Sequence, residues 1–490
     1  MTPGPAKSRP HPRPVTAGLA ARKRALEIVV AVLDQGEPLE YILDRDGAKA
    51  VVGKSVTPMG KGKGAQHRSP ANIPSGPNHL PANDRALARA IAATTLRRRG
   101  QIDQILARSM EKPLGKRGGI ALHILRVAVA QILFMDVPDH ASVSLAMELA
   151  KADGKARHFS KLVNGVLRGI ARDRAALLGD LDPLDNLPDW LRQRWSATYG
   201  AAITRQMAGS LLNEPYLDIR LKQGATHSFD PAMVHAVLPN GSLRLRGRGL
   251  VSDLAGYNEG IWWVQDMAAS LAPVLFGDVA GKRIADLCAA PGGKTVFLAD
   301  AGARVTAVDV SRERLVKLQE NLSRLHLKAE IVLSDIADFV PDALFDGVLL
   351  DAPCSATGTV RRHPDILALK TPEVIERMAK VQRQMLRRAV DMLAPGGILV
   401  YCTCSLEPEE GEAVLDFIRQ ENLPLTVVPV EGAEVGGLTA ILRPDGTIRT
   451  RPDHDPLTPE ADMPNVDPAP AVSPMSGIDG FFIARFRKRG

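Results

Sequence analysis

The 490-residue chain lacks the long apolar run that a membrane-spanning helix requires. Its most apolar stretch, residues 118–135, is interrupted by His123, Arg126 and Gln131, and we expect it to form a buried helix. Residues 1–16 are basic and rich in proline but contain no apolar segment, which argues against a secretory signal. The expected location is therefore the cytoplasm, without membrane association.

Cysteine is also scarce, and the four residues of this type all lie in the last part of the chain, at 288, 354, 402 and 404. None of them forms a Cys-x-x-Cys pair, so neither a disulfide framework nor a metal site is expected. Buried free cysteines are usually inert, and this is the expected role of Cys288 and Cys402. Cys354 and Cys404 differ, because each directly follows an apolar segment typical of a strand.

Charge is unevenly distributed along the chain. The chain has 45% hydrophobic and 24% charged residues, which is typical of globular proteins, and its length suggests about three domains. The net charge is +7, but residues 1–173 contain 28 Lys and Arg against 14 Asp and Glu. This excess favours an acidic partner such as a nucleic acid, although a basic surface kept for solubility would look the same.

The pattern of apolar residues divides the chain into four parts. Residues 1–17 form a tail that we expect to be disordered. Residues 18–173 have helical periodicity throughout, except for a Gly- and Pro-rich insert at 53–82 that we expect to be disordered. Residues 174–270 combine a linker helix with a small α+β module. Its basic residues lie beside aromatic ones, which suits single-stranded RNA, although a packed strand face would look alike: Arg220, Lys222, Arg244, Arg246 and Arg248.

Residues 271–490 alternate between apolar strands and helices, which predicts a doubly wound parallel sheet. We expect residues 443–474 to form a surface loop and residues 479–486 to add a last strand at one edge. The five strands predicted for the body of the sheet are 283–288, 304–310, 329–335, 346–352 and 397–404.

A glycine-rich turn follows the first of these strands, in the segment DLCAAPGGKT at 286–295. Its spacing matches neither the Gly-x-Gly-x-x-Gly dinucleotide motif nor a phosphate-binding P-loop, in which Cys288 would have to be glycine. Asp309 and Asp335 follow the next two strands, where carboxylates can accept hydrogen bonds from ribose, although either could simply cap a helix. A P-loop NTPase stays as an alternative, because Asp351 also ends an apolar strand.

Three segments together carry a more specific pattern: 286–295, DAPCSATGTVRRHPDI at 351–366, and YCTCSLEPEEGE at 401–412. They resemble the RNA cytosine-5 methyltransferases that use S-adenosylmethionine. The helical segments 85–100, 123–151 and 161–168 are similar to the NusB-type RNA-binding domain. In this order the parts resemble the bacterial 16S rRNA cytosine-5 methyltransferases of the RsmB or Sun family. One departure is Ala356, where the resemblance leads us to expect glycine.

The resemblance implies an all-α NusB-like domain, a small α+β RNA-binding module and a class I, Rossmann-like methyltransferase domain. It also implies that Cys404 is the nucleophile, that Asp351 binds the cytosine edge and lies near the sulfonium, and that Cys354 serves product release. The implied cofactor is S-adenosylmethionine, with Asp309 at its ribose and Asp335 near its adenine. The other implied cofactor contacts are Cys288, Ala289, Ala290, Pro291, Gly292, Gly293 and Lys294.

The chemistry explains why such an enzyme needs a cysteine. Carbon 5 of cytosine is a poor nucleophile until a thiolate adds to carbon 6, so the thiolate of Cys404 must be favoured locally. Lys294, or Arg361 and Arg362, could supply the positive charge. The expected substrate is 16S rRNA or a small-subunit assembly intermediate, bound by a monomer. A transfer RNA substrate and a NusB-like regulator without enzymatic activity stay as alternatives.

Overall fold

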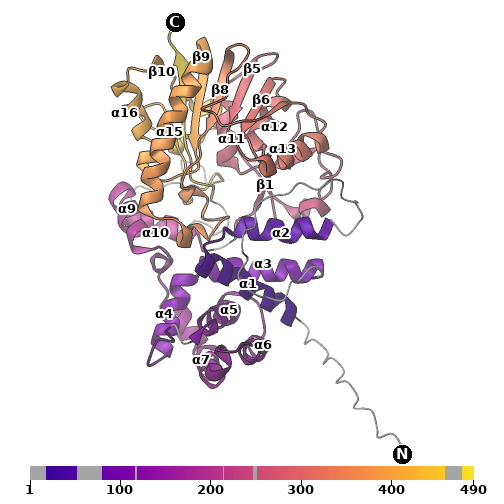
Figure 1. Ribbon diagram of the computed structural model, residues 1–490, viewed down its shortest axis with the longest axis vertical. Helices are drawn as coiled ribbons and strands as arrows, with labels where there is room; N and C mark the ends of the chain where they lie inside the picture. The colour runs from indigo at the N-terminus through magenta and orange to yellow at the C-terminus, as the bar shows by residue number, and fades with distance from the viewer. Residues whose placement is uncertain (1–17, 52–79, 116–117, 213, 247–250, 458–476) are drawn as a thin grey trace, which may run out of the picture. The chain divides into compact units, whose positions relative to one another are not determined.

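The computed structural model describes residues 18–51, 80–115, 118–212, 214–246, 251–457 and 477–490 (Figure 1). The chain divides into two compact units, the first ending at Leu181 and the second beginning at Asp182. The boundary expected after residue 173 lies before this division, because the short helix α8 contacts α7 of the first unit. The expected tail at 1–17, nearly all of the expected insert at 53–82, and Arg248 lie outside the described residues.

Every regular element described in the first unit is a helix. The helix α5 is buried along almost its whole length, and α1, α3, α6 and α7 pack against it. No helix in the described ranges is long and apolar enough to cross a membrane. The α-helices are α1 (Leu19–Gln35), α2 (Leu39–Val51), α3 (Ala82–Arg97), α4 (Arg99–Ser109), α5 (Ala121–Phe134), α6 (Asp139–Ala152), α7 (Ser160–Arg172) and α8 (Arg174–Gly179).

The polar residues that interrupt α5 each have a partner, which explains how the helix can be buried. His123 Nε2 lies 3.1 Å from a carboxylate oxygen of Asp34. Arg126 donates two hydrogen bonds to the carboxylate of Asp103, at 2.7 and 2.8 Å. Gln131 donates to a backbone carbonyl one turn earlier, at 2.9 Å. Burial of a polar group is tolerated when such a bond replaces water.

The second unit begins with the helices α9 (Asp189–Tyr199) and α10 (Ala201–Ser210), followed by a small antiparallel sheet. The sheet has the strand order β2-β3-β1-β4 and encloses a small core around Trp262. The segment 231–237, which looks helical in sequence, forms only a 3-10 turn before strand β2. The strands are β1 (Leu217–Leu221), β2 (Val234–Val237), β3 (Leu243–Leu245) and β4 (Trp262–Val264).

Three of the basic residues in this small sheet contact protein rather than solvent. Arg244 is buried in an ion pair with Asp218, at 2.7 Å. The guanidinium of Arg220 lies 4.4 Å from the ring centroid of Phe297, and Lys222 Nζ donates to a backbone carbonyl at 2.7 Å. Only Arg246 among the four described residues is exposed. The packed-face interpretation therefore applies to most of these cations.

The large sheet has the strand order β10-β12-β9-β8-β5-β6-β7, with β11 paired to β12. The strands from β9 to β7 are parallel, while β10, β11 and β12 are antiparallel additions. The strands are β5 (Arg283–Leu287), β6 (Arg304–Asp309), β7 (Glu330–Leu333), β8 (Phe345–Asp351), β9 (Leu393–Thr403), β10 (Leu425–Val427), β11 (Ile448–Arg449) and β12 (Phe482–Lys488). The helices are α11 (Met267–Val274), α12 (Gly293–Asp300), α13 (Arg312–Arg324), α14 (Ile366–Leu369), α15 (Pro372–Met392) and α16 (Ala413–Gln420).

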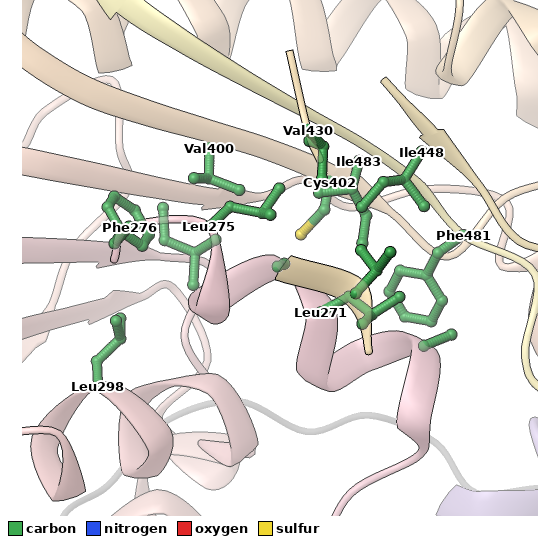
Figure 2. Packing of buried hydrophobic residues seen from close by; sticks show 14 of the residues in the cluster. Leu271, Leu275, Phe276, Leu298, Val400, Cys402, Val430, Ile448, Phe481 and Ile483 are labelled. Carbon is green, nitrogen blue, oxygen red and sulfur yellow. The ribbon is translucent and has the colours of Figure 1, made fainter. Parts of the chain in front are cut away.

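Helices cover both faces of this sheet, as a doubly wound fold requires (Figure 1). Because side chains alternate along a strand, Val400 and Cys402 point toward α11 while Tyr401 points toward α15 and α16. Figure 2 shows Cys402 among the apolar side chains that fill the space between the sheet and α11. Cys402 is fully buried there, as expected for an inert small residue.

Two expectations about the C-terminal part are wrong. The strand β12 does not lie at the edge of the sheet but between β9 and β10, because its phenylalanines are buried in the sheet core. The expected loop at 443–474 is not all surface, since Thr447, Thr450 and the short strand β11 between them are buried. Both segments contribute to the core near β9.

Gly358 connects the segment after β8 to the segment that leads into β12. Its carbonyl oxygen accepts a hydrogen bond from Gly480 N at 2.8 Å, and its own N–H donates to Cys404 O at 3.0 Å. A Cβ atom at Gly358 would lie 1.8 Å from the backbone oxygen of Gly480. The two backbones can therefore approach each other only because this residue has no side chain.

The substitution Gly358→Ala is expected to destabilise the second unit by about 3 kcal/mol, because the overlap must push the two backbones apart. Urea-induced unfolding would measure the change. Gly209→Ala is the matched control, since Gly209 lies in α10 with open space around it and alanine should stabilise that helix by about 0.5–1 kcal/mol. Equal stabilities of Gly358→Ala and the wild type would show that the two backbones tolerate a methyl group at this contact.

Candidate active site

The carboxyl ends of the parallel strands converge on one edge of the large sheet. Strand β8 ends at Asp351, and β9 ends at Thr403, directly before Cys404. The pairing register of the two strands puts Asp351 opposite Cys402. The segments that leave β8 and β9 therefore start side by side.

The structure brings Cys354 and Cys404 into contact at this edge. Their sulfur atoms lie 3.3 Å apart, and both thiols are free. Ala352 N donates to Cys402 O at 2.9 Å, so strand pairing continues past the end of β8. The hydrogen bond of Gly358 N to Cys404 O, described above, ties the second half of the loop to the same segment. The sulfur contact thus follows from backbone pairing on both sides.

The environment keeps one of the two thiols protonated. The hydrogen bond with Cys404, burial, and the nearby charge of Glu410 all raise the pKa of Cys354 well above its ordinary value. A neutral Cys354 can donate its S–H to the neighbouring sulfur.

Lys294 and Asp351 form an ion pair next to the thiols, with Nζ 2.7 Å from the Asp351 carboxylate. Burial disfavours the charge of Lys294, but Asp351 and the sulfurs of Cys402 and Cys404 outweigh it, so the pKa of Lys294 is raised. The second carboxylate oxygen of Asp351 lies 3.3 Å from the Cys402 sulfur. The positive charge of Lys294 is thus held at the end of β8, close to Cys402 and Cys404.

The two arginines expected as alternative sources of charge are largely neutralised. Arg361 is buried and donates to Asp266 at 3.2 Å and to the carbonyl of Gly477 at 2.6 Å. Arg362 donates to Asp479 at 2.7 Å, although its environment still includes Cys404. These arginines mainly connect the loop after β8 to the C-terminal segment.

The loop at 288–294 has the tight conformation of a ligand-binding turn. Cys288 and Gly292 both have positive φ, at 64° and 107°, and a Cβ at Gly292 would lie 2.2 Å from the Leu318 side chain. Ala289 N donates to Val308 O, and Gly293 begins α12. Burial raises the pKa of Cys288, which keeps this thiol neutral.

The two acidic residues after β6 and β7 have different surroundings. Asp309 is buried and accepts hydrogen bonds from Ser311 N at 2.9 Å and from Ala290 N at 3.1 Å. It therefore joins the end of β6 to the loop at 288–294. Asp335 is exposed and accepts from Ala337 N in its own turn, at 2.9 Å. The structure connects Asp309 to the loop that holds other predicted site residues, whereas the hydrogen bonds of Asp335 in the described part of the chain stay within its own turn.

Asp286 was not predicted as a site residue, although it opens the glycine-rich motif. Its side chain is buried, and one oxygen accepts from Thr295 Oγ1 at 2.6 Å. The other oxygen, Oδ1, has no hydrogen-bond partner among the described residues. Burial raises the pKa of Asp286 to about 7. A buried acceptor without a partner is uncommon in proteins and indicates a ligand position.

Ala356 lies in the left-handed region of backbone conformation, with φ 62°. An L-amino acid pays about 1–2 kcal/mol for this conformation, whereas glycine adopts it freely. The conformation of the loop therefore explains why glycine is expected at this position. The methyl group of Ala356 packs against a cluster of buried residues that includes Trp195 and Leu406.

Comparison with known families finds matches for both units of the chain. Residues 274–487 match the family model described as 16S rRNA methyltransferase RsmB/F, and residues 52–172 match that of the NusB family. The crystal structure of PH0851 has the same fold, with a TM-score of 0.67 at 20% identity over 97% of this chain and 100% of that one.

Curated relatives match along most of the chain. The ribosomal RNA small subunit methyltransferase B of Sodalis glossinidius is 37% identical, covering 68% of this chain and 80% of that protein. The protein of the same name from Pasteurella multocida is 31% identical, covering 85% of this chain and 92% of that protein. With both its units matched in this order, the chain belongs to the RsmB/F family of 16S rRNA methyltransferases.

Proposed function

We propose that this chain transfers the methyl group of S-adenosylmethionine to carbon 5 of a cytosine in 16S rRNA, through a covalent bond between Cys404 and carbon 6. The observation that carries the proposal is the 3.3 Å contact of the Cys354 and Cys404 sulfurs beside the Lys294–Asp351 ion pair. The names of the relatives support the substrate. An RNA-binding regulator would have no use for two thiols in this arrangement.

The first step is addition of a thiolate to the base. The Cys404 sulfur gives an electron pair to carbon 6, and the electrons of the C5–C6 double bond make carbon 5 nucleophilic. Lys294 stabilises the thiolate before attack, and Asp351 hydrogen-bonds the N3 and amino edge of the cytosine as charge develops there. S-adenosylmethionine, when bound, supplies the methyl group as an electrophile on its sulfonium.

The second step releases the product. A water molecule takes the proton from carbon 5, the electrons of that C–H bond restore the C5–C6 double bond, and the electron pair of the Cys404–C6 bond returns to sulfur. We assign Cys354 to this step, because its neutral S–H can donate a hydrogen bond to the departing thiolate. Without that bond the covalent intermediate should persist.

The residues at the strand ends fit S-adenosylmethionine. The Oδ1 atom of Asp286 is a buried acceptor at the start of the glycine-rich loop, and the ammonium group of a methionine moiety would give it a charged donor. Asp309 would hold the ribose hydroxyls and Asp335 would lie near the adenine. The loop at 288–294 would surround the rest of the ligand, with its backbone close enough to bind because of Gly292.

The RNA partner is proposed to be 16S rRNA, either free or in an assembling small subunit, bound by a monomer of this chain. The NusB match and the excess of Lys and Arg before residue 174 support phosphate contacts by the first unit. Such contacts hold the RNA in place but carry little sequence information. The target base must be unstacked to reach the thiols.

Replacing each of the two cysteines by alanine should block a different step of the reaction. Cys404→Ala is expected to abolish methyl transfer and leave cofactor affinity unchanged, because it removes only the nucleophile. Cys354→Ala should allow addition but slow release, so that a protein–RNA adduct stable in a denaturing gel accumulates. Methylation by Cys404→Ala, or release of free product by Cys354→Ala at the wild-type rate, would contradict the assignment of that residue.

Asp286→Asn tests the fit of the cofactor. The pKa of Asp286 lies above its ordinary 3.8, so its charge destabilises the fold above about pH 7, and this cost disappears as the pH falls toward 3.8. The ligand-free variant should therefore melt at a higher temperature than the wild type above pH 7, and at a similar one near pH 4. Its affinity for S-adenosylmethionine should fall by about tenfold or more, as calorimetry would measure.

The exposed residue Asp338, on the loop after β7, supplies the control for this variant. Asp338→Asn removes the same charge and should change neither the melting temperature nor cofactor affinity. If Asp286→Asn binds S-adenosylmethionine as tightly as the wild type does, Asp286 is not a cofactor-binding residue.

The experiment that tests the proposed function is methyl transfer from isotopically labelled S-adenosylmethionine, followed by nucleoside analysis of the RNA. The substrates are unmethylated 16S rRNA, small-subunit assembly intermediates lacking the modification, and unmodified transfer RNA. Label in 5-methylcytidine from 16S rRNA or its intermediates is the expected result. Label from transfer RNA alone would contradict 16S rRNA as the substrate. The absence of label with every RNA would contradict the proposed enzymatic function.

A further inference from the structure

Each of the two thiols is followed in the chain by a buried serine. Ser355 and Ser405 have no exposed surface, and their hydroxyl oxygens lie 3.1 Å apart. This contact parallels the 3.3 Å contact of the sulfurs one residue earlier. The two loops are therefore held together by a second, polar layer behind the reactive one.

Glu410 joins these two serines through its carboxylate. Both hydroxyls donate to Oε2, while Ser355 N and Gln382 Nε2 donate to Oε1 at 2.8 and 3.1 Å. Glu410 is fully buried, and none of these four donors carries a charge. The four donors stabilise the ionised carboxylate, while burial raises the pKa of Glu410 above its ordinary value.

The position of Glu410 is itself fixed by the rigid parts of the fold. Its backbone oxygen accepts from Tyr401 Oη at 2.9 Å and from Thr403 Oγ1 at 3.1 Å, both on β9. Gln382, on α15, also donates to Pro353 O at 2.9 Å, in the segment of Cys354. The carboxylate is thus held by a strand and a helix while it contacts both thiol-bearing loops.

We infer that Glu410 is a positioning residue that holds the two thiols at their working separation and keeps a negative charge behind Cys354. The inference rests on the proposed function, since the separation matters only if one sulfur adds to the base and the other assists its departure. Misplacement by about 1 Å of a reacting group can cost about a hundredfold in rate.

The charge of Glu410 acts on the Cys354 thiol. It contributes to the raised pKa of Cys354, and Tyr401 faces the same thiol. Lys294 and Arg362 carry positive charges close to Cys404. The charge of Glu410 therefore adds to the hydrogen bond with Cys404 and to burial in keeping Cys354 protonated. Removing the charge of Glu410 should let Cys354 lose its proton at lower pH.

Glu410→Gln tests the inference, because it removes the charge and changes few atoms. In folded enzyme of wild-type melting temperature, kcat should fall by about tenfold to a hundredfold, with KM for RNA and cofactor changed by less than about twofold. The pH profile of Cys354 alkylation by iodoacetamide, followed by mass spectrometry, should shift to lower pH. A residue with only a structural role would change the amount of folded protein but neither of these readouts.

Glu409→Gln is the matched control, since Glu409 is the neighbouring residue, partly exposed, and paired with Arg194 at 2.7 Å. It should leave kcat within about twofold of the wild type. If Glu410→Gln does not fold, Ser355→Ala removes one hydroxyl donor and keeps the backbone bond to Glu410. Ser355→Ala should also lower kcat, but by a smaller factor than Glu410→Gln.

Folded Glu410→Gln or Ser355→Ala with the kcat of the wild type would overturn the inference. Alkylation needs neither RNA nor cofactor, so it separates this inference from the proposed function. A shifted Cys354 profile in a protein whose wild type methylates no RNA would keep the positioning role and reject the function. An unshifted profile in folded Glu410→Gln would reject the positioning role, whatever the activity of the wild type.

Discussion

The parallel pairing of β8 with β9 determines where chemistry can take place in this protein. The register puts Asp351 opposite Cys402, and the hydrogen bonds of Ala352 and Gly358 continue the pairing beyond the strands. Cys354 and Cys404 leave the sheet from these paired ends, so backbone hydrogen bonds bring their sulfurs together, and the side-chain network of Glu410 joins the two loops behind them. A reactive pair built in this way needs little ordering when the substrate binds.

Buried charge around this edge is almost always paired, and the exceptions are informative. Lys294 pairs with Asp351, and Arg361 pairs with Asp266. Asp286 has a buried oxygen without a partner among the described residues, and Glu410 is held by uncharged donors alone. An unpaired buried carboxylate costs stability, so a protein keeps one only where a ligand or a mechanism uses the charge. The two exceptions lie at the proposed cofactor site and behind the thiols.

Sequence patterns were sufficient to predict those strands and site residues whose signal lies within a short segment of the chain. The five parallel strands follow from short apolar runs between helices, and the thiols were singled out because each directly follows one of these runs. The place of β12 could not be predicted, because a phenylalanine-rich segment fits an edge strand or an inner one equally well. Glu410 was missed because its partner Ser355 is 55 residues away in the chain, and a single glutamate within a motif carries no separate signal.

The segment between the two matched families also contributes to the site, which its sequence did not indicate. Arg194 and Trp195 of α9 both donate to Glu407, which is buried in the loop that follows Cys404. Without these donors the carboxylate of Glu407 would be buried and unpaired, which would favour displacement of that loop into solvent. Helix α9 is thus part of the scaffold that holds the loop after Cys404, the proposed nucleophile. Arg244 and Lys222 of the same unit likewise contact protein, through Asp218 and the backbone carbonyl of Leu325.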